Sequence, residues 1–283
     1  MATVATMATM TIKDILLLLD SDGEDQSAAA YASALADLLG AHLTAAGVAY
    51  ELIVPSGFAG DYPYEMLAAI TEQSRERAAK AYERLRAASP DSLHSELVQI
   101  DALPGQARDD FARLARHFDM TIIGQPPEPG DDAGLMAEAA LFNSGRPVLF
   151  VPRIQKAAPR FERVLVAWDG SHAAARALSD ALPLLEKSKV IDVISIADPR
   201  TAYKELPGFN ITRHLSRHGL NAELKRLPVS GDIGDTILSY AADAGADLLV
   251  MGGYGHSRLR EFVLGGTTRT ILSSMTLPVL MSH

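Results

Sequence analysis

The sequence predicts an α/β fold of two tandem, doubly wound units, each a five-stranded parallel sheet with helices on both faces. Three observations predict it: the length of the chain, an internal repeat, and an alternation of short apolar runs with helical patterns. The chain has 283 residues, and at about 100–200 residues per domain this length suggests two domains.

Composition narrows the classes of protein to consider. With 48% hydrophobic and 22% charged residues, the chain does not resemble a disordered polymer. The formal net charge of -9 opposes a general nucleic-acid coat, although backbone N–H groups can still form a local phosphate pocket. The absence of cysteine excludes disulfides and thiolate nucleophiles. Residues 1–10 lack the Lys or Arg of a signal peptide, and the aliphatic run 15–19 is far shorter than a membrane span. We therefore expect a cytoplasmic protein, without nucleic acid or membrane as partner.

A weak internal repeat organises the chain. Three pairs of segments correspond in the same order: 14–20 with 163–169, 118–124 with 246–252, and 146–150 with 277–281. The first segment of each half is an apolar run that ends in an aspartate. The repeat predicts two domains, 1–154 and 159–283, joined by a linker at 155–160 that contains Pro159.

Within the second half, apolar runs alternate with helical patterns. The predicted strands lie at 164–168, 190–196, 222–227, 248–251 and 278–281. Four helices are predicted between these strands. The first is capped by Ser171, runs to about residue 185 and is kinked or ended by Pro183, and the second is a short helix around Ile211 and Leu215. The third begins after Asp232 and ends at Gly245, and the fourth lies near 268–274. The first half follows the same pattern, with a longer helix at about 65–88. Strands and helices that alternate imply a parallel sheet covered on both faces, whose ligands sit at the carboxyl ends of the strands where the strand order reverses.

The segment 251–268 carries the most chemistry. It follows a predicted strand, is rich in glycine, and ends by opening a helix, where free N–H groups favour a phosphate. Gly252 and Gly255 leave room for backbone to approach a ligand. The helix start and the flanking cations supply the other candidates: Gly265, Gly266, Thr267, Thr268, His256 and Arg258. The alternative is that these glycines only serve tight turns. The segment matches neither a Walker loop nor the G-x-G-x-x-G pattern.

These residues resemble the universal stress protein family. The spacing Gly252-x2-Gly255-x9-Gly265 is similar to the nucleotide loop of that family, and the segments 166–171 and 276–280 are similar to its first and last strands. The resemblance covers both halves, so the chain is similar to a tandem universal stress protein. It implies an adenine nucleotide α-hydrolase-like sheet, pairing of units through their last strands and, in one branch of the family, bound ATP.

The resemblance also implies roles for single residues. Asp169 matches the aspartate that contacts the nucleoside, Ile196 matches an apolar residue beside the adenine, and Thr268 matches a residue that reaches phosphate. The candidate set also takes in the neighbours Ala167, Trp168, Met251 and Gly253. One departure is Gly266, where the family usually has Ser or Thr, so we expect weaker phosphate binding, with Thr267 as a compensating hydroxyl.

The first half departs further from the family pattern. Asp20 is kept, but the segment 124–132 contains three prolines, which cannot donate N–H. Glu128, Asp131 and Asp132 would repel a phosphate. We expect this half to be a degenerate universal stress protein domain that does not bind ATP.

Three other sequence patterns are better explained by structure than by a functional site. His214 and His218 share a helical face without a third metal ligand, so a solvated face is favoured over a metal site. Ser171, His172 and Asp169 are too close in sequence to face one another as a catalytic triad. The charged run 72–86 is typical of a solvated helix.

The sequence thus predicts a stress-response protein that binds ATP, with or without Mg²⁺, in its second half only. We expect the halves to pack as a pseudo-dimer through their last strands, and a homodimer is compatible with the family. No catalytic residue or metal ligand is assigned. Two alternatives stay open: a protein-interaction module of the same fold without nucleotide, and an enzyme with at most slow ATP hydrolysis.

Overall fold

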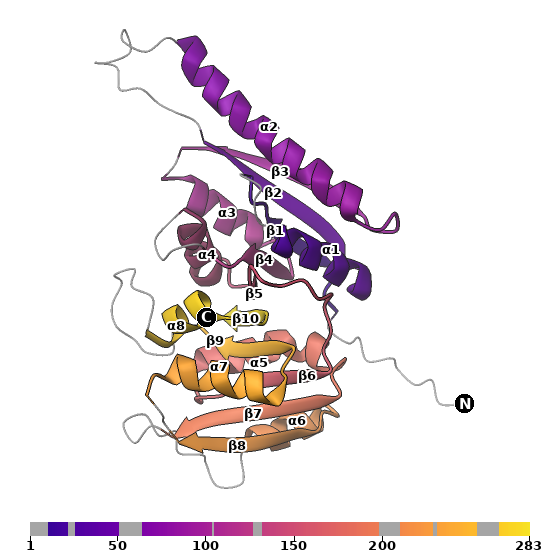
Figure 1. Ribbon diagram of the computed structural model, residues 1–283, viewed down its shortest axis with the longest axis vertical. Helices are drawn as coiled ribbons and strands as arrows, with labels where there is room; N and C mark the ends of the chain where they lie inside the picture. Colours follow the sequence, from indigo (N-terminus) through magenta and orange to yellow (C-terminus); the bar gives the residue numbers. More distant parts are fainter. Residues whose placement is uncertain are drawn as a thin grey trace.

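The structure is a computed structural model that describes residues 11–21, 26–50, 64–103, 105–126, 132–197, 210–228, 231–253 and 266–283. Strands and helices alternate along these residues (Figure 1). The strands are β1 (Asp14–Leu18), β2 (His42–Tyr50), β3 (Ser95–Ala102), β4 (Met120–Gly124), β5 (Val148–Val151), β6 (Arg163–Ala167), β7 (Val190–Ala197), β8 (Ala222–Pro228), β9 (Leu248–Gly252) and β10 (Val279–Ser282). The helices are α1 (Ser27–Leu39), α2 (Tyr64–Ala88), α3 (Ala107–Ala115), α4 (Asp132–Asn143), α5 (His172–Leu185), α6 (Ile211–Arg217), α7 (Ile233–Ala244) and α8 (Gly266–Ser274).

The strands form one continuous sheet with the order β3-β2-β1-β4-β5-β10-β9-β6-β7-β8. Neighbouring strands are parallel except at the centre, where β5 and β10 pair antiparallel with Val279 opposite Phe150. Read outward from this central pair, the two blocks of five strands have the same order. The α/β class, the two parallel blocks and the pairing through the last strands agree with the sequence prediction, and Figure 1 shows the blocks joined into a single sheet.

Helices cover both faces of the sheet, because the central strands are apolar on both sides. In β1, Ile15 and Leu17 belong to one buried cluster and Leu16 to the other, as expected when successive side chains point to opposite faces. The first cluster includes residues of α1, α2, α5 and α6, and the second includes residues of α3, α4, α7 and α8. The continuous apolar runs found in the sequence are therefore strands buried on both faces.

The repeated aspartate before the fourth strand of each half has the same structural role. The Oδ2 atom of Asp119 accepts hydrogen bonds from the backbone N–H groups of Lys13 (2.7 Å) and Asp14 (3.1 Å). In the second half, Oδ2 of Asp247 accepts the N–H of Arg163 at 3.0 Å. Each carboxylate thereby satisfies backbone donors at the start of the neighbouring first strand, which would otherwise depend on water.

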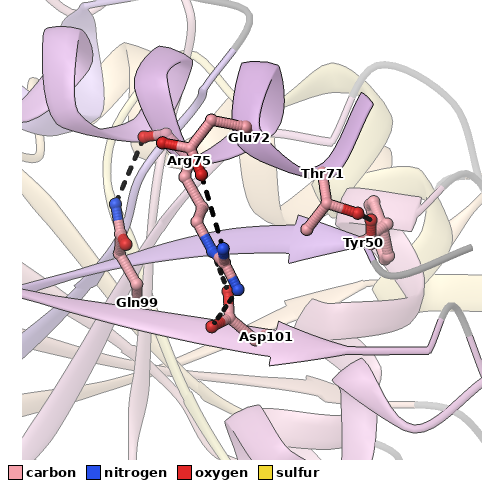
Figure 2. Close-up of polar contacts among 6 residues, drawn as sticks. All are labelled: Tyr50, Thr71, Glu72, Arg75, Gln99 and Asp101. Atoms are coloured by element: carbon pink, nitrogen blue, oxygen red, sulfur yellow. Dashed lines mark hydrogen bonds and ion pairs between the residues drawn. The ribbon is translucent and has the colours of Figure 1, made fainter. Parts of the chain in front are cut away.

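Helix α2 distinguishes the first half from the second, where the shorter α6 follows the equivalent strand. The guanidinium of Arg75 on α2 makes two hydrogen bonds to the carboxylate of Asp101 on β3, at 3.0 and 2.8 Å (Figure 2). The side chain of Gln99 donates to the Arg75 carbonyl at 3.2 Å, and the Thr71 hydroxyl donates to the Tyr50 carbonyl at 3.3 Å. These contacts fasten the helix across the edge of the sheet, and Figure 1 shows its first turns extending past the strands.

The connection between β5 and β6, residues 152–162, contains no helix or strand and includes the predicted linker. It is packed against the second half, because Phe161 is buried and Arg160 pairs with Asp247 at 2.6 Å. The helices within the described parts of the chain are all too short or too polar to cross a lipid bilayer.

Candidate functional site

The strand order of the second half reverses between β6 and β9. Strand β6 pairs with β7 on one side, with Ala167 opposite Ile194, and with β9 on the other side, with Ala167 opposite Met251. Ligands of open α/β sheets bind outside the carboxyl ends of the strands at such a reversal. The segments that follow β6 and β9 are the two that the sequence selected.

Asp169 lies at this edge, exposed to solvent. Its Oδ1 atom accepts the backbone N–H of Ser171 at 2.9 Å, across Gly170, whose φ of 76° is in the left-handed region that favours glycine. The hydroxyl of Ser171 accepts the N–H of Ala174 at 3.1 Å and so caps α5. This turn fixes the position of the Asp169 carboxylate. The Ser171 hydroxyl caps the helix and does not face His172 and Asp169 as the nucleophile of a catalytic triad would.

Gly252 and Gly253 make close contacts with neighbouring helices. A Cβ atom at Gly252 would lie 2.5 Å from the backbone nitrogen of Ala174 and 2.7 Å from the carbonyl carbon of Ala173. A Cβ at Gly253 would lie 2.9 Å from the end of the Leu141 side chain in α4. The sequence suggested that Gly252 makes room for a ligand; in the structure the first turn of α5 already fills that space.

The start of α8 carries three further candidate residues. Gly266 is exposed, and a Cβ there would meet no atom of the described residues within 4 Å. Thr267 is half-buried, whereas Thr268 is only 3% exposed. Ala167, Ile196 and Met251 contribute to the same buried cluster as the residues of α7 and α8, so the apolar candidates lie on the α8 face of the sheet. Trp168 packs against the opposite cluster.

Ten of the fourteen candidate residues lie within the described residues, at or directly after the ends of β6, β7 and β9 and at the start of α8. The other candidates, Gly255, His256, Arg258 and Gly265, lie outside the described residues.

The equivalent edge of the first half carries a different set of side chains. Asp20 is exposed after β1, but the residue after Gly124 is Gln125, followed by Pro126. Glu128 and Asp131 lie outside the described residues, while Asp132 is the first residue of α4.

Tyr50, at the end of β2, interacts with Asp132. Burial, the charge of Asp132 and a hydrogen bond to its carboxylate raise the pKa of Tyr50 to about 12, although Arg108 opposes the shift. The phenol is thus protonated at neutral pH and donates to Asp132 at the start of α4. The sequence analysis missed Tyr50, because no local pattern links two residues more than 80 positions apart.

The histidine pair on α6 offers no metal centre within the described residues. The rings of His214 and His218 are 4.8 Å apart, edge to face. Burial lowers the pKa of His214, and the charges of His218 and Arg217 lower it further. No cluster of three or more His, Cys, Asp or Glu side chains with metal-binding geometry occurs among the residues the structure describes.

Comparisons with known proteins agree with this arrangement. The Universal stress protein family model matches residues 160–283. Universal stress protein Slr1230 of Synechocystis is 26% identical over 289 residues, which cover 95% of this chain and 99% of that protein. The crystal structure of a universal stress protein from Archaeoglobus fulgidus superposes with a TM-score of 0.67 at 17% identity, covering 95% of this chain and 96% of that one. A putative universal stress protein from Pseudomonas aeruginosa gives a TM-score of 0.55 at 16% identity, covering 95% and 92%. The second half therefore matches the universal stress protein family, and the chain as a whole is similar to a full-length universal stress protein.

Proposed function

We propose that the chain binds ATP at the carboxyl edge of β6 and β9 in its second half, and acts as a stress-response protein through this site. The observation that carries the proposal is that Asp169 follows β6 where the strand order reverses toward β9, and that α8 is the next helix after β9 along the chain. A carboxylate is suited to accept hydrogen bonds from ribose hydroxyls, and a helix N-terminus is suited to face a phosphate. The apolar side chain of Ile196, which packs on the α8 face, is suited to contact the adenine.

We propose further that the first half does not bind ATP. Asp132 places a negative charge at the start of α4, where a phosphate would need backbone donors, and Tyr50 is hydrogen-bonded to this carboxylate. Gln125 and Pro126 stand where the second half begins its glycine-rich segment. The two halves then differ in ligand binding although their strand order is the same.

The test is calorimetric titration with ATP, with and without Mg²⁺, of the wild type and two matched variants. We expect one site per chain. Asp169→Ala should weaken binding by about tenfold or more, because a hydrogen bond to a charged group contributes about 1.5–3 kcal/mol. Asp20→Ala removes the equivalent carboxylate of the first half and should leave the affinity unchanged. No binding by the wild type, or two sites per chain, would contradict the proposal.

Two further measurements strengthen this design. Trp168 is the single tryptophan of the chain and directly precedes Asp169, so we expect its fluorescence to change when ATP occupies the site. The variant Gly266→Ser restores the hydroxyl that the family pattern usually has, and no atom of the described residues lies within 4 Å of a Cβ placed there. We expect tighter ATP binding by this variant, with an unchanged melting temperature.

A further inference from the structure

The side chain of His283 connects the two halves of the molecule beside the proposed site. Its ring lies edge to face with Phe142 of α4 in the first half, at 4.8 Å between centroids, and with His172 of α5, at 5.8 Å. Its Nδ1 atom is 3.0 Å from the carbonyl oxygen of Gly253. Because a carbonyl oxygen can only accept, Nδ1 carries the hydrogen and donates it.

Gly253 is held from three directions. Its N–H donates to the carbonyl of Ser282 at 2.8 Å, and its carbonyl accepts the hydrogen bond from His283. The side chain of Leu141 closes the space where a Cβ would be. Both backbone polar groups of Gly253 are therefore engaged, directly after β9 ends at Gly252.

The end of β10, from which His283 extends, is itself tied to α5. The hydroxyl of Ser282 donates to the carboxylate of Asp180 at 2.9 Å, and Arg176 donates to the same carboxylate at 2.9 Å. Arg176 also donates to the carbonyl of Gly145 in the first half at 3.1 Å. Helix α5 begins just after Asp169, so these contacts join both the turn that carries Asp169 and the end of β9 to the first half.

In the first half, the counterpart of Gly253 is held by equivalent backbone hydrogen bonds but by different side chains. The N–H of Gln125, the counterpart of Gly253, donates to the carbonyl of Val151 at 2.8 Å, and Arg153 donates to the Gln125 carbonyl at 3.3 Å. Gln125 adds its own side-chain hydrogen bond to Leu272 of α8 at 2.8 Å. Gly253 has no side chain for this purpose, so the second half depends on His283 and on the packing of α4.

We propose that His283 is a positioning residue for the nucleotide site, and that Phe142 of the first half holds it in place. This inference rests on the proposed function, since Gly253 directly follows β9, at whose carboxyl edge ATP is expected to bind. The first half then has a role without binding a nucleotide: its helix α4 helps to hold the residue that follows β9 at the edge of the site.

The test compares three changes in the full chain. His283→Ala removes the donor, whereas His283→Asn keeps an N–H donor on the atom bonded to Cγ, as Nδ1 is in histidine. Phe142→Ala removes the contact from the first half. The control is His117→Ala, at an exposed histidine of the first half that is distant in sequence from these contacts.

Two readouts separate the inference from the proposed function. The first is hydrogen–deuterium exchange without nucleotide, in peptides that contain Gly253, with peptides of α7 as the internal reference. We expect faster exchange around Gly253 in His283→Ala and Phe142→Ala, wild-type exchange in His283→Asn and His117→Ala, and no change in α7. The second is the Kd for ATP from Trp168 fluorescence, which His283→Ala should raise about three- to tenfold, the effect of one hydrogen bond.

The outcomes are distinct. Unchanged exchange around Gly253 in His283→Ala overturns the inference, whether or not the wild type binds ATP. Faster exchange with an unchanged Kd overturns the positioning role and leaves the proposed function intact. If the wild type fails to bind ATP, the proposed function and the positioning role fall together, and exchange still decides whether His283 anchors Gly253.

Discussion

Gly252 is required by packing within the protein, whereas the sequence suggested that it makes room for a ligand. The first turn of α5 approaches β9 so closely that a Cβ at Gly252 would contact its backbone rather than a movable side chain. Gly266 stands at the other extreme, because a Cβ there would meet no atom of the described residues within 4 Å. The two glycines look alike in a sequence pattern, yet among the described contacts those at Gly252 require a glycine and those at Gly266 do not.

This contrast gives a prediction about stability. Gly252→Ala should lower the free energy of unfolding by about 1–3 kcal/mol, because the backbone of α5 must move to accept the methyl group. Gly266→Ala is the matched control and should leave it unchanged. Urea titrations followed by circular dichroism measure both variants, and equal stability would show that α5 moves aside without cost.

At the scale of elements, three adjacent strands of the second half share a buried charge. Asp192 on β7 is 1% exposed and accepts hydrogen bonds from Arg163 on β6 (2.5 Å) and Lys225 on β8 (2.9 Å). Burial alone would raise the pKa of Asp192, but the hydrogen bonds and charges of Lys225 and Arg163 lower it overall. The carboxylate thus ties β6, β7 and β8 together while it is ionised.

The sign of the pH dependence follows from this lowered pKa. The pKa of Asp192 is lower in the folded protein than in the unfolded chain. The carboxylate therefore stabilises the fold fully at a pH above its pKa in the unfolded chain, and this stabilisation is lost as the pH falls through its pKa in the folded protein. Asp192→Asn should destabilise the protein by about 1–3 kcal/mol at pH 7 and flatten the acid limb of its stability curve. Glu223→Gln, which alters a 75% exposed partner of Lys225, is the control and should have little effect. Denaturant midpoints between pH 3 and pH 8 distinguish the two variants.

The sequence predicted most of the elements, because their signals are local. The cap of α5 by Ser171, the cap of α7 by Asp232 and the end of α7 at Gly245 are all found in the structure. Pro183 lies in the last turn of α5, where the helix continues only to Leu185. Capping and hydrophobic period involve residues a few positions apart, so a single sequence contains them.

At the scale of the whole molecule, β5 and β10 decide the architecture. Val279, Leu280 and Met281 are fully buried between β9 and β5, so neither block of five strands leaves its last strand as an open edge. Antiparallel pairing reverses the strand direction at the centre, so the carboxyl edges of the two blocks face opposite ways. The two equivalent ligand edges are therefore separate, and one can change without the other.

The segment 159–283 produced by itself should associate into dimers. Without β5, strand β10 would be an apolar edge that can pair with another copy of itself, and the antiparallel β5–β10 pair shows the required geometry. Light scattering after size exclusion should give twice the mass of the segment, with the full chain as the reference. A folded segment that stays monomeric at high concentration would contradict this prediction.

The sequence by itself determined the alternation of strands and helices, the repeat, and the place of Asp169 and the glycines at the carboxyl ends of two strands. Periodicity, caps and turn residues encode these features locally. Only the tertiary structure decided that α5 fills the space beside Gly252, that Tyr50 binds Asp132, and that His283 holds Gly253. Each of these contacts joins residues at least 30 positions apart, and it forms because the strand order within each half brings the ends of distant segments together.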